Sequence, residues 1–154
     1  MCRVLISACL LGVNCRYNGI PKKNEDALAL LEKKGIHFIP VCPEQLGGMA
    51  TPRLPSEKKD DRVVNAAGED VTSYYVRGAQ ETLKLAKLYG CRFALLKERS
   101  PSCGCNGIYD GTFSGKLVEG AGITAALLQE NGIEVFGESE TMILEIAMTP
   151  CGIS

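Results

Sequence analysis

The sequence lacks several features that whole classes of function require. It has no tryptophan and a single histidine, His37. With only one histidine, a Cys–His zinc site and a Ser-His-Asp triad are both poorly supported. We expect His37 in the core or on a sheet face. No Walker loop and no G-x-G-x-x-G segment follow a strand-like run, so a nucleotide cofactor is weakly supported. The eight cysteines include no C-x-x-C pair, which removes the common zinc-ribbon and thioredoxin patterns.

The chain also lacks an excess of charge and a long apolar run. Its formal net charge of −1 offers no electrostatic footprint for a nucleic-acid backbone. No apolar run approaches the ~20 residues that span a bilayer. The few residues before Ser7-Ala8-Cys9 are too short for the apolar region of a signal peptide. We therefore expect a cytoplasmic protein with no nucleic-acid or membrane partner. Its thiols should stay reduced there, which favours metal binding or catalysis over disulfides.

Strand-like and helix-like segments alternate along the chain. Strands are predicted at about residues 3–8, 36–41, 92–97 and 133–136, and helices at about 25–34, 72–89, 123–131 and 140–147. Asn24 and Thr72 are the expected N-caps of the first two helices. This order predicts an α/β fold, in which one Rossmann-like domain over residues 1–154 has a parallel sheet of about four strands flanked by helices.

Two long irregular segments separate these elements, at residues 42–71 and 98–122. Long loops in a compact domain are more often functional than idle, and we expect both at the carboxyl edge of the sheet. Within the second loop, the segment around Asp110-Gly111 is typical of a tight hairpin.

Three cysteines each follow one of the predicted strands. Cys9 follows the first strand, Cys42 follows the second, and Cys103 follows the third after a short loop. Because the carboxyl ends of parallel strands meet at one edge of a sheet, the three thiols should converge where open α/β sheets bind their ligands. Soft sulfur ligands in one cleft indicate a metal or iron–sulfur site.

The other five cysteines carry weaker predictions. Cysteine is a small, often buried apolar residue, and this explains Cys2 and Cys91 well enough. Cys151 is expected in a loose tail. Cys15 and Cys105 flank the three candidate ligands, so each could ligate a metal or act as a spare thiol.

Two residues beside the candidate ligands could take part in catalysis. Glu44 lies two residues after Cys42 and would suit a general base if it is partly buried, although an ordinary surface glutamate is about equally expected. Ser100 begins the segment Ser100-Pro101-Ser102-Cys103 and could orient water or donate to bound sulfur. Ordinary turn chemistry would explain the same serine.

Five motifs in this order resemble those of the thiouracil desulfidase family, over about residues 2 to 137. They are S-A-C-L-L-G at residues 7–12 with Cys15-Arg16-Tyr17, Cys42-Pro43-Glu44 with Gly47-Gly48, Pro52-Arg53, S-P-S-C-G at residues 100–104, and Y-D-G-T-F-S-G at residues 109–115. One departure is Asn18, where an aspartate is expected after Arg16-Tyr17.

The resemblance implies a [4Fe-4S] cluster held only by Cys9, Cys42 and Cys103, with one iron left open. That iron would bind the sulfur of a thiocarbonyl as a Lewis acid while water replaces the sulfur at carbon, with no net redox change. Glu44 matches the family's proposed acid/base residue, and Ser100 matches a serine that positions water or substrate. The implied function is non-redox desulfuration of a thiouracil-like pyrimidine base to the oxo-base, with release of sulfide.

Two other classes of function stay open at this point. A non-catalytic metal or iron–sulfur cluster-binding protein, such as a carrier or sensor, would need the thiols but not Glu44 or the hydroxyls. A thiol redox protein would use Cys103 and Cys105. The sequence identifies neither the physiological substrate nor the oligomeric state.

Overall fold

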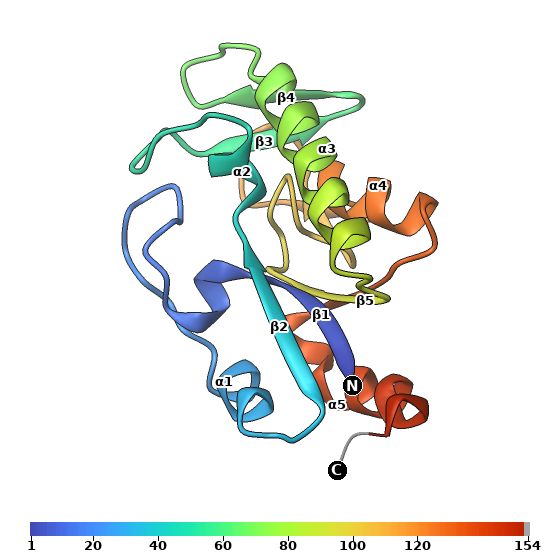
Figure 1. Ribbon diagram of the computed structural model, residues 1–154. Coiled ribbons are helices and arrows are strands. Elements are labelled where there is room, and N and C mark those ends of the chain that lie inside the picture. The colour runs from blue at the N-terminus through green and yellow to red at the C-terminus, as the bar shows by residue number, and fades with distance from the viewer. Residues whose placement is uncertain (153–154) are drawn as a thin grey trace.

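The computed structural model describes residues 1–152 of the chain. Its centre is a four-stranded parallel sheet in the order β2-β1-β5-β8 (Figure 1). The strands are β1 (Cys2–Ser7), β2 (Ile36–Val41), β5 (Phe93–Leu96) and β8 (Glu134–Gly137). The predicted α/β fold with a parallel sheet of about four strands is therefore confirmed.

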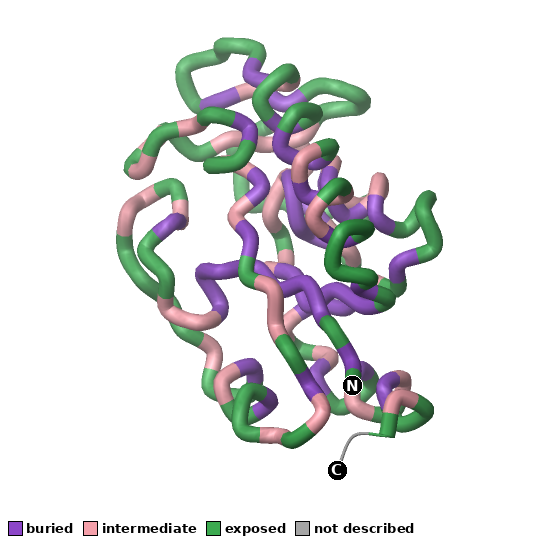
Figure 2. Tube along the Cα trace, in the orientation of Figure 1, coloured by how far each residue is buried: buried purple, intermediate pink, exposed green. Residues whose placement is uncertain are grey.

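Helices cover both faces of this sheet (Figure 1). One face packs against α1 (Glu25–Leu31) and α5 (Thr141–Met148), and the other packs against α3 (Thr72–Leu88) and α4 (Ile123–Glu130). Strand β1 shows why: Val4 and Ile6 belong to the first core, whereas Leu5 belongs to the second. Alternate side chains of a strand point to opposite faces, so a strand covered on both sides is apolar throughout. Figure 2 shows the resulting buried stretch at the centre of the molecule. None of the helices in residues 1–152 is both long enough and apolar enough to cross a bilayer.

The strand order creates a switch point beside β1. The chain passes from β1 to β2 on one side, and then returns to the other side of β1 to form β5. At such a point the connections leave the sheet in opposite directions, which opens a crevice at the carboxyl ends of the strands. The segments that follow β1, β2 and β5 all begin at this crevice.

The helix boundaries show one correct and one wrong cap prediction. Asn24 caps α1 as expected, because its side chain accepts a hydrogen bond of 2.9 Å from the backbone N–H of Ala27. The helix ends at Leu31 rather than at residue 34. Thr72 does not cap α3. Val71 is the N-cap, and the Asp70 carboxylate accepts the hydrogen bond from the N–H of Thr72 at 3.0 Å.

The first long loop is more regular than its sequence indicates. It contains the short helix α2 (Pro43–Leu46) and an antiparallel hairpin of β3 (Ser56–Lys59) and β4 (Arg62–Asn65). Elements of four residues are too short to show a helical or strand periodicity. The prediction of an irregular segment over residues 42–71 was wrong for that reason.

The second long loop contains the expected hairpin but not the expected tight turn. Strands β6 (Ile108–Tyr109) and β7 (Leu117–Val118) pair antiparallel, with residues 110–116 between them. The Asp110 carboxylate accepts a hydrogen bond from the N–H of Thr112 at 2.9 Å, which bends the chain within this loop. The local Asp-Gly signal therefore marks a bend inside a wider loop.

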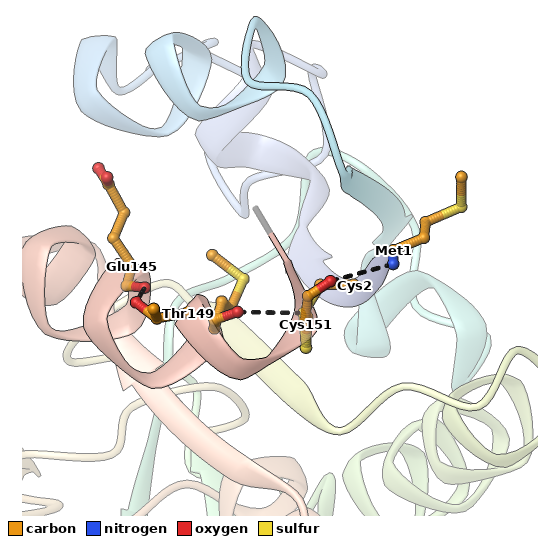
Figure 3. The surroundings of a disulfide bond; sticks show 6 residues. Met1, Cys2, Glu145, Thr149 and Cys151 are labelled. Atoms are coloured by element: carbon orange, nitrogen blue, oxygen red, sulfur yellow. Dashed lines mark hydrogen bonds between the residues drawn. A yellow bond between two sulfur atoms is a disulfide. The ribbon is translucent and has the colours of Figure 1, made fainter. Parts of the chain in front are cut away.

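A disulfide links the two ends of the described chain. Cys2 at the start of β1 is bonded to Cys151 in the final 3₁₀ turn, η3 (Thr149–Cys151), as Figure 3 shows. The N-terminal amino group of Met1 also donates to the carbonyl of Cys151 at 3.2 Å. The predictions of reduced thiols throughout and of a loose tail at Cys151 were wrong for this pair, since packing of α5 beside β1 brings the two ends together.

Helix α2 lies against α3 at unusually close range. A Cβ atom added to Gly78 of α3 would lie 1.9 Å from the carbonyl oxygen of Pro43, and one added to Gly47 would lie 2.0 Å from the carbonyl oxygen of Tyr74. No side chain fits at either position, so glycine is required for the two backbones to approach this closely. This contact fixes where the segment after Cys42 begins.

We predict that Gly78→Ala will destabilise the protein, although alanine is the better helix former by about 1 kcal/mol. The added methyl group would collide with the Pro43 carbonyl, and overpacking of this kind costs typically about 1–3 kcal/mol. Thermal unfolding followed by circular dichroism should show a lower Tm. Gln80→Ala, at an exposed position of the same helix, should leave Tm nearly unchanged. An equal or higher Tm for Gly78→Ala would show that the close approach is not needed.

Candidate active site

A pocket of about 500 Å³ opens at the carboxyl ends of the central strands. Its lining includes all five residues that the sequence singled out: Cys9, Cys42, Cys103, Glu44 and Ser100. These residues are separated by up to 94 positions in the chain, from Cys9 to Cys103. The fold therefore brings the candidate ligands and the candidate catalytic residues to one place.

Cys9 reaches the pocket through a tight turn after β1. The 3₁₀ turn η1 (Ala8–Leu11) begins directly after Ser7 and is capped by Gly12, which has a φ of +91°. Ser7 itself ties two strand ends together, because its hydroxyl accepts a hydrogen bond of 2.9 Å from the N–H of Lys97, just after β5. Cys9 is only 8% exposed at the inner wall of the pocket.

A fourth thiol, that of Cys15, lies beside Cys9 and Cys42. The Cys42 thiol donates to the carbonyl of Cys15 at 3.7 Å, and the Cys15 thiol forms side-chain hydrogen bonds with both neighbours. The pKa of Cys42 lies far above its ordinary value. The hydrogen bond with Cys15 is the larger cause and burial is the smaller one. For Cys15 the hydrogen bond with Cys42 lowers the pKa, but contact with Cys9 and burial raise it to about 11. The structure thus places Cys15 in the pocket, whereas sequence reasoning left it open.

Cys103 is held by a loop that is fastened to the start of α4. The carbonyl of Ser102 accepts a hydrogen bond of 2.9 Å from the N–H of Thr124, and the two hydroxyls of these residues lie 2.8 Å apart. The backbone of Gly122 packs so tightly on Ser102 that a Cβ atom there would lie 2.4 Å away. Burial raises the pKa of the Cys103 thiol to about 12. The thiol is therefore protonated near neutral pH while no metal is bound.

Ser100 builds the same loop and also faces the pocket. Its hydroxyl oxygen accepts hydrogen bonds from the N–H groups of Ser102 at 3.1 Å and Cys103 at 3.0 Å. A serine hydroxyl can accept two hydrogen bonds and donate one. Both accepted bonds are turn chemistry, and the hydroxyl hydrogen remains available for a group in the pocket.

Glu44 is a partly buried side chain whose two carboxylate oxygens are both bound. The Arg53 guanidinium donates to one oxygen at 2.9 Å, and the Tyr75 hydroxyl donates to the other. The side chains of Glu44 and Arg53 are only 18% and 6% exposed, so the alternative of an ordinary surface glutamate was wrong. Burial, with the nearby Glu44 charge, raises the pKa of Tyr75, which keeps its hydroxyl protonated as a donor.

Sequence reasoning assigned no role to the two partners of Glu44. Arg53 stood within a recognised motif, but nothing local showed which carboxylate it meets. Tyr75 lies on α3, whose residues have the pattern of an ordinary amphipathic helix. Nothing in that pattern indicates a polar contact with α2.

Aromatic side chains form part of the pocket wall. Tyr17, Tyr109 and Phe113 all line it, and Tyr17 and Phe113 are each 40% exposed. The N–H of Phe113 donates to the Glu57 carboxylate at 3.1 Å, which anchors its loop to β3. Aromatic faces stack well on flat rings, so this wall suits a planar heterocycle. Tyr17 and the loop of residues 109–115 belong to recognised motifs, although the sequence gave them no role.

The remaining free cysteines lie elsewhere. Cys105 is outside the pocket lining, and its thiol faces the Glu140 carboxylate at 4.0 Å. Burial raises its pKa to about 11. Cys91 is a buried core residue as expected, and His37 is exposed on β2. The pairing of Cys103 with Cys105 that a thiol redox protein requires is therefore not favoured by their surroundings.

The donor set of the pocket suits an iron–sulfur cluster better than a single metal ion. Within residues 1–152, no three His, Cys, Asp or Glu side chains are arranged to hold one metal ion. An iron–sulfur cluster makes a different demand, because each cysteine binds its own iron atom around a larger body. The thiols of Cys9, Cys42 and Cys103 around a hollow of about 500 Å³ meet that demand in ligand type and in room.

Comparisons with known proteins identify the family of this chain. The family model described as 2-thiouracil desulfurase matches residues 4–140. A Bacillus subtilis (strain 168) protein, YbbK, described as uncharacterized, is 44% identical, and the match covers 89% of this chain and 96% of YbbK. A solved structure described as the [4Fe-4S]-dependent thiouracil desulfidase TudS is 42% identical, with a TM-score of 0.87 and coverage of 97% of this chain and 99% of that chain. The chain therefore belongs to the 2-thiouracil desulfurase family.

Proposed function

We propose that this protein is a desulfidase that converts a thiolated pyrimidine base such as thiouracil to the oxo-base and releases sulfide. The observation that carries the proposal is the convergence of three thiols, a fixed carboxylate and a serine hydroxyl in one aromatic-walled pocket. The description of TudS as a [4Fe-4S]-dependent thiouracil desulfidase supports the same activity and the same cofactor for this chain.

Cys9, Cys42 and Cys103 are the proposed ligands of a [4Fe-4S] cluster. When bound, such a cluster with three cysteine ligands would supply a Lewis-acidic iron with a position left for the sulfur of the substrate. The three thiols come from three separate strand ends that the fold holds in place, so the binding site requires no large rearrangement of the sheet. The disulfide of Cys2 and Cys151 uses none of these residues.

The other pocket residues take the remaining tasks. The ring of the substrate lies against Tyr17, Tyr109 or Phe113, which orients its thiocarbonyl and excludes water from its faces. Glu44 accepts a proton from the attacking water, and the Ser100 hydroxyl donates a hydrogen bond that positions water or substrate. The balance is one thiocarbonyl and one water giving one carbonyl and one hydrogen sulfide, without electron transfer.

We propose that residues 1–154 act as one domain, that the substrate is a small molecule, and that the protein works in the cytoplasm without a nucleic-acid partner. A carrier or sensor would use the thiols but has no need for the Glu44 network or the aromatic wall, so the catalytic function accounts for more of the pocket.

The first prediction from the proposed function concerns ligation. Cys9→Ser, Cys42→Ser and Cys103→Ser should each strongly reduce the iron bound after anaerobic reconstitution, because each variant removes one thiolate from a shared centre. Iron and sulfide analysis with visible absorption measures this. Cys91→Ala and Cys105→Ala, both outside the pocket lining, should bind as much iron as the unaltered protein. Equal losses in all five variants would contradict the three-ligand assignment.

The second prediction concerns the protonation of the ligands. The thiolate is the form that alkylating reagents attack, and a raised pKa lowers its fraction at pH 8. In the iron-free protein, Cys42 and Cys103 should therefore react with iodoacetamide more than about 100-fold slower at pH 8 than in urea-unfolded protein, and faster as the pH rises. Peptide mass spectrometry measures each site. Rates at pH 8 equal to those of the unfolded chain would contradict it.

The third prediction concerns Glu44. Glu44→Gln keeps the size of the side chain and removes the base, so kcat should fall roughly 10²–10⁴-fold. The iron content and the visible spectrum should not change, because Glu44 is not a proposed ligand. Glu57→Gln offers a matched control, since Glu57 also lines the pocket but binds the loop that carries Phe113. Its kcat should fall far less, and full activity of Glu44→Gln would place the base elsewhere.

A further inference from the structure

Glu44 is bound by two side chains that lie outside the pocket lining. It lines the pocket, whereas Arg53 and Tyr75, which bind its two oxygens, are not part of the lining. A carboxylate offers about four lone-pair sites, so two of them remain when Arg53 and Tyr75 each take one. Arg53 and Tyr75 therefore act from outside the pocket lining, and both bind the Glu44 carboxylate directly.

Arg53 connects Glu44 to the segment that carries the fourth thiol. The guanidinium group that binds Glu44 also donates to the carbonyl of Cys15 at 3.0 Å and to the carbonyl of Ala50 at 3.1 Å. The backbone N–H of Arg53 donates to the carbonyl of Tyr17 at 2.7 Å. Residues 15–17, which include a pocket thiol and an aromatic wall residue, are thereby held at a fixed place relative to the carboxylate.

Tyr75 connects Glu44 to the rigid part of the fold. Its side chain is 1% exposed within a small core that also contains Val63 and Val71. It belongs to α3, which meets α2 through the backbone contact at Gly47 and Gly78. The hydroxyl therefore cannot shift without moving a packed helix, and the carboxylate is fixed from a second direction.

Stability alone is a weak reason for this arrangement. Burying an arginine and a carboxylate costs desolvation energy that often equals or exceeds their attraction, and apolar residues of similar volume would serve a core as well. A precisely held acceptor, in contrast, is what proton transfer to a positioned group requires.

We propose that Tyr75 and Arg53 are positioning residues for desulfuration, which hold Glu44 so that its remaining lone pairs face the pocket and the attacking water. This inference rests on the proposed function of Glu44 as the proton acceptor. It assigns to α3 and to the Pro52-Arg53 turn a role in the reaction without contact with substrate or cofactor.

The test begins with Tyr75→Phe in the reconstituted enzyme. Loss of one hydroxyl frees one carboxylate oxygen, and small misplacements of a catalytic group are costly, so kcat should fall at least about tenfold with little change in KM. Iron content and the visible spectrum should match those of the unaltered enzyme. The control is Tyr74→Phe, which removes a hydroxyl from the adjacent, 40% exposed tyrosine of the same helix and should have no effect.

A double variant separates positioning from general support of the structure. In the Glu44→Gln background, Tyr75→Phe should cause no further loss of kcat, because its effect acts only through the carboxylate. Arg53→Lys keeps the charge but not the planar fork, and should retain more activity than Arg53→Gln. A crystal structure of iron-free Tyr75→Phe should show the Glu44 carboxylate turned, with Cys42 and Cys103 in place.

The outcomes distinguish this inference from the proposed function. A fully active Tyr75→Phe enzyme beside an impaired Glu44→Gln enzyme would overturn the inference alone. Loss of iron in Tyr75→Phe, or an equal loss of kcat in both backgrounds, would also overturn it by showing a structural role. A fully active Glu44→Gln enzyme would instead contradict the proposed role of Glu44.

Discussion

The position of β1 between β2 and β5 is the constraint on which the pocket depends. Parallel register places Ser7 beside Val41, and the Ser7 hydroxyl accepts a hydrogen bond from the N–H of Lys97. The three strands thus end together, and the segments after them leave from a common edge. Because each of these cysteines follows the end of its strand by at most seven residues, Cys9, Cys42 and Cys103 reach one pocket although they share no local motif.

A second constraint acts behind that edge. The two glycines at the contact of α2 and α3 let the Glu44 carboxylate of α2 meet the Tyr75 hydroxyl of α3, and Arg53 binds the other carboxylate oxygen. The pocket is therefore organised in two layers. Thiols, a serine and aromatic rings face the space where a substrate would bind, and Arg53 and Tyr75 behind them set the direction of the Glu44 carboxylate. The proposed chemistry draws on both layers, since sulfur must be held while water is deprotonated nearby.

Much of this arrangement could be predicted from the sequence, and the rest could not for identifiable reasons. Continuous apolar runs mark strands buried on both faces, so the sheet and the thiols that follow its strands were predictable. Asn24 acts within its own turn and was also predictable. The Cys2–Cys151 disulfide depends on packing between chain ends, and the contact of Tyr75 with Glu44 depends on how closely two helices approach. Neither leaves a local pattern. Cys15 lies between these cases, since its position in a motif was visible but its contacts with two thiols were not.

If water replaces sulfur on the substrate without electron transfer, the oxygen of the product comes from the solvent. The enzyme, reconstituted anaerobically with iron and sulfide, would be supplied with 2-thiouracil in ¹⁸O-labelled water and no reductant. We expect uracil that carries the solvent label, with sulfide released in equal amount. Unlabelled uracil, or turnover that begins only after a reductant is added, would contradict it.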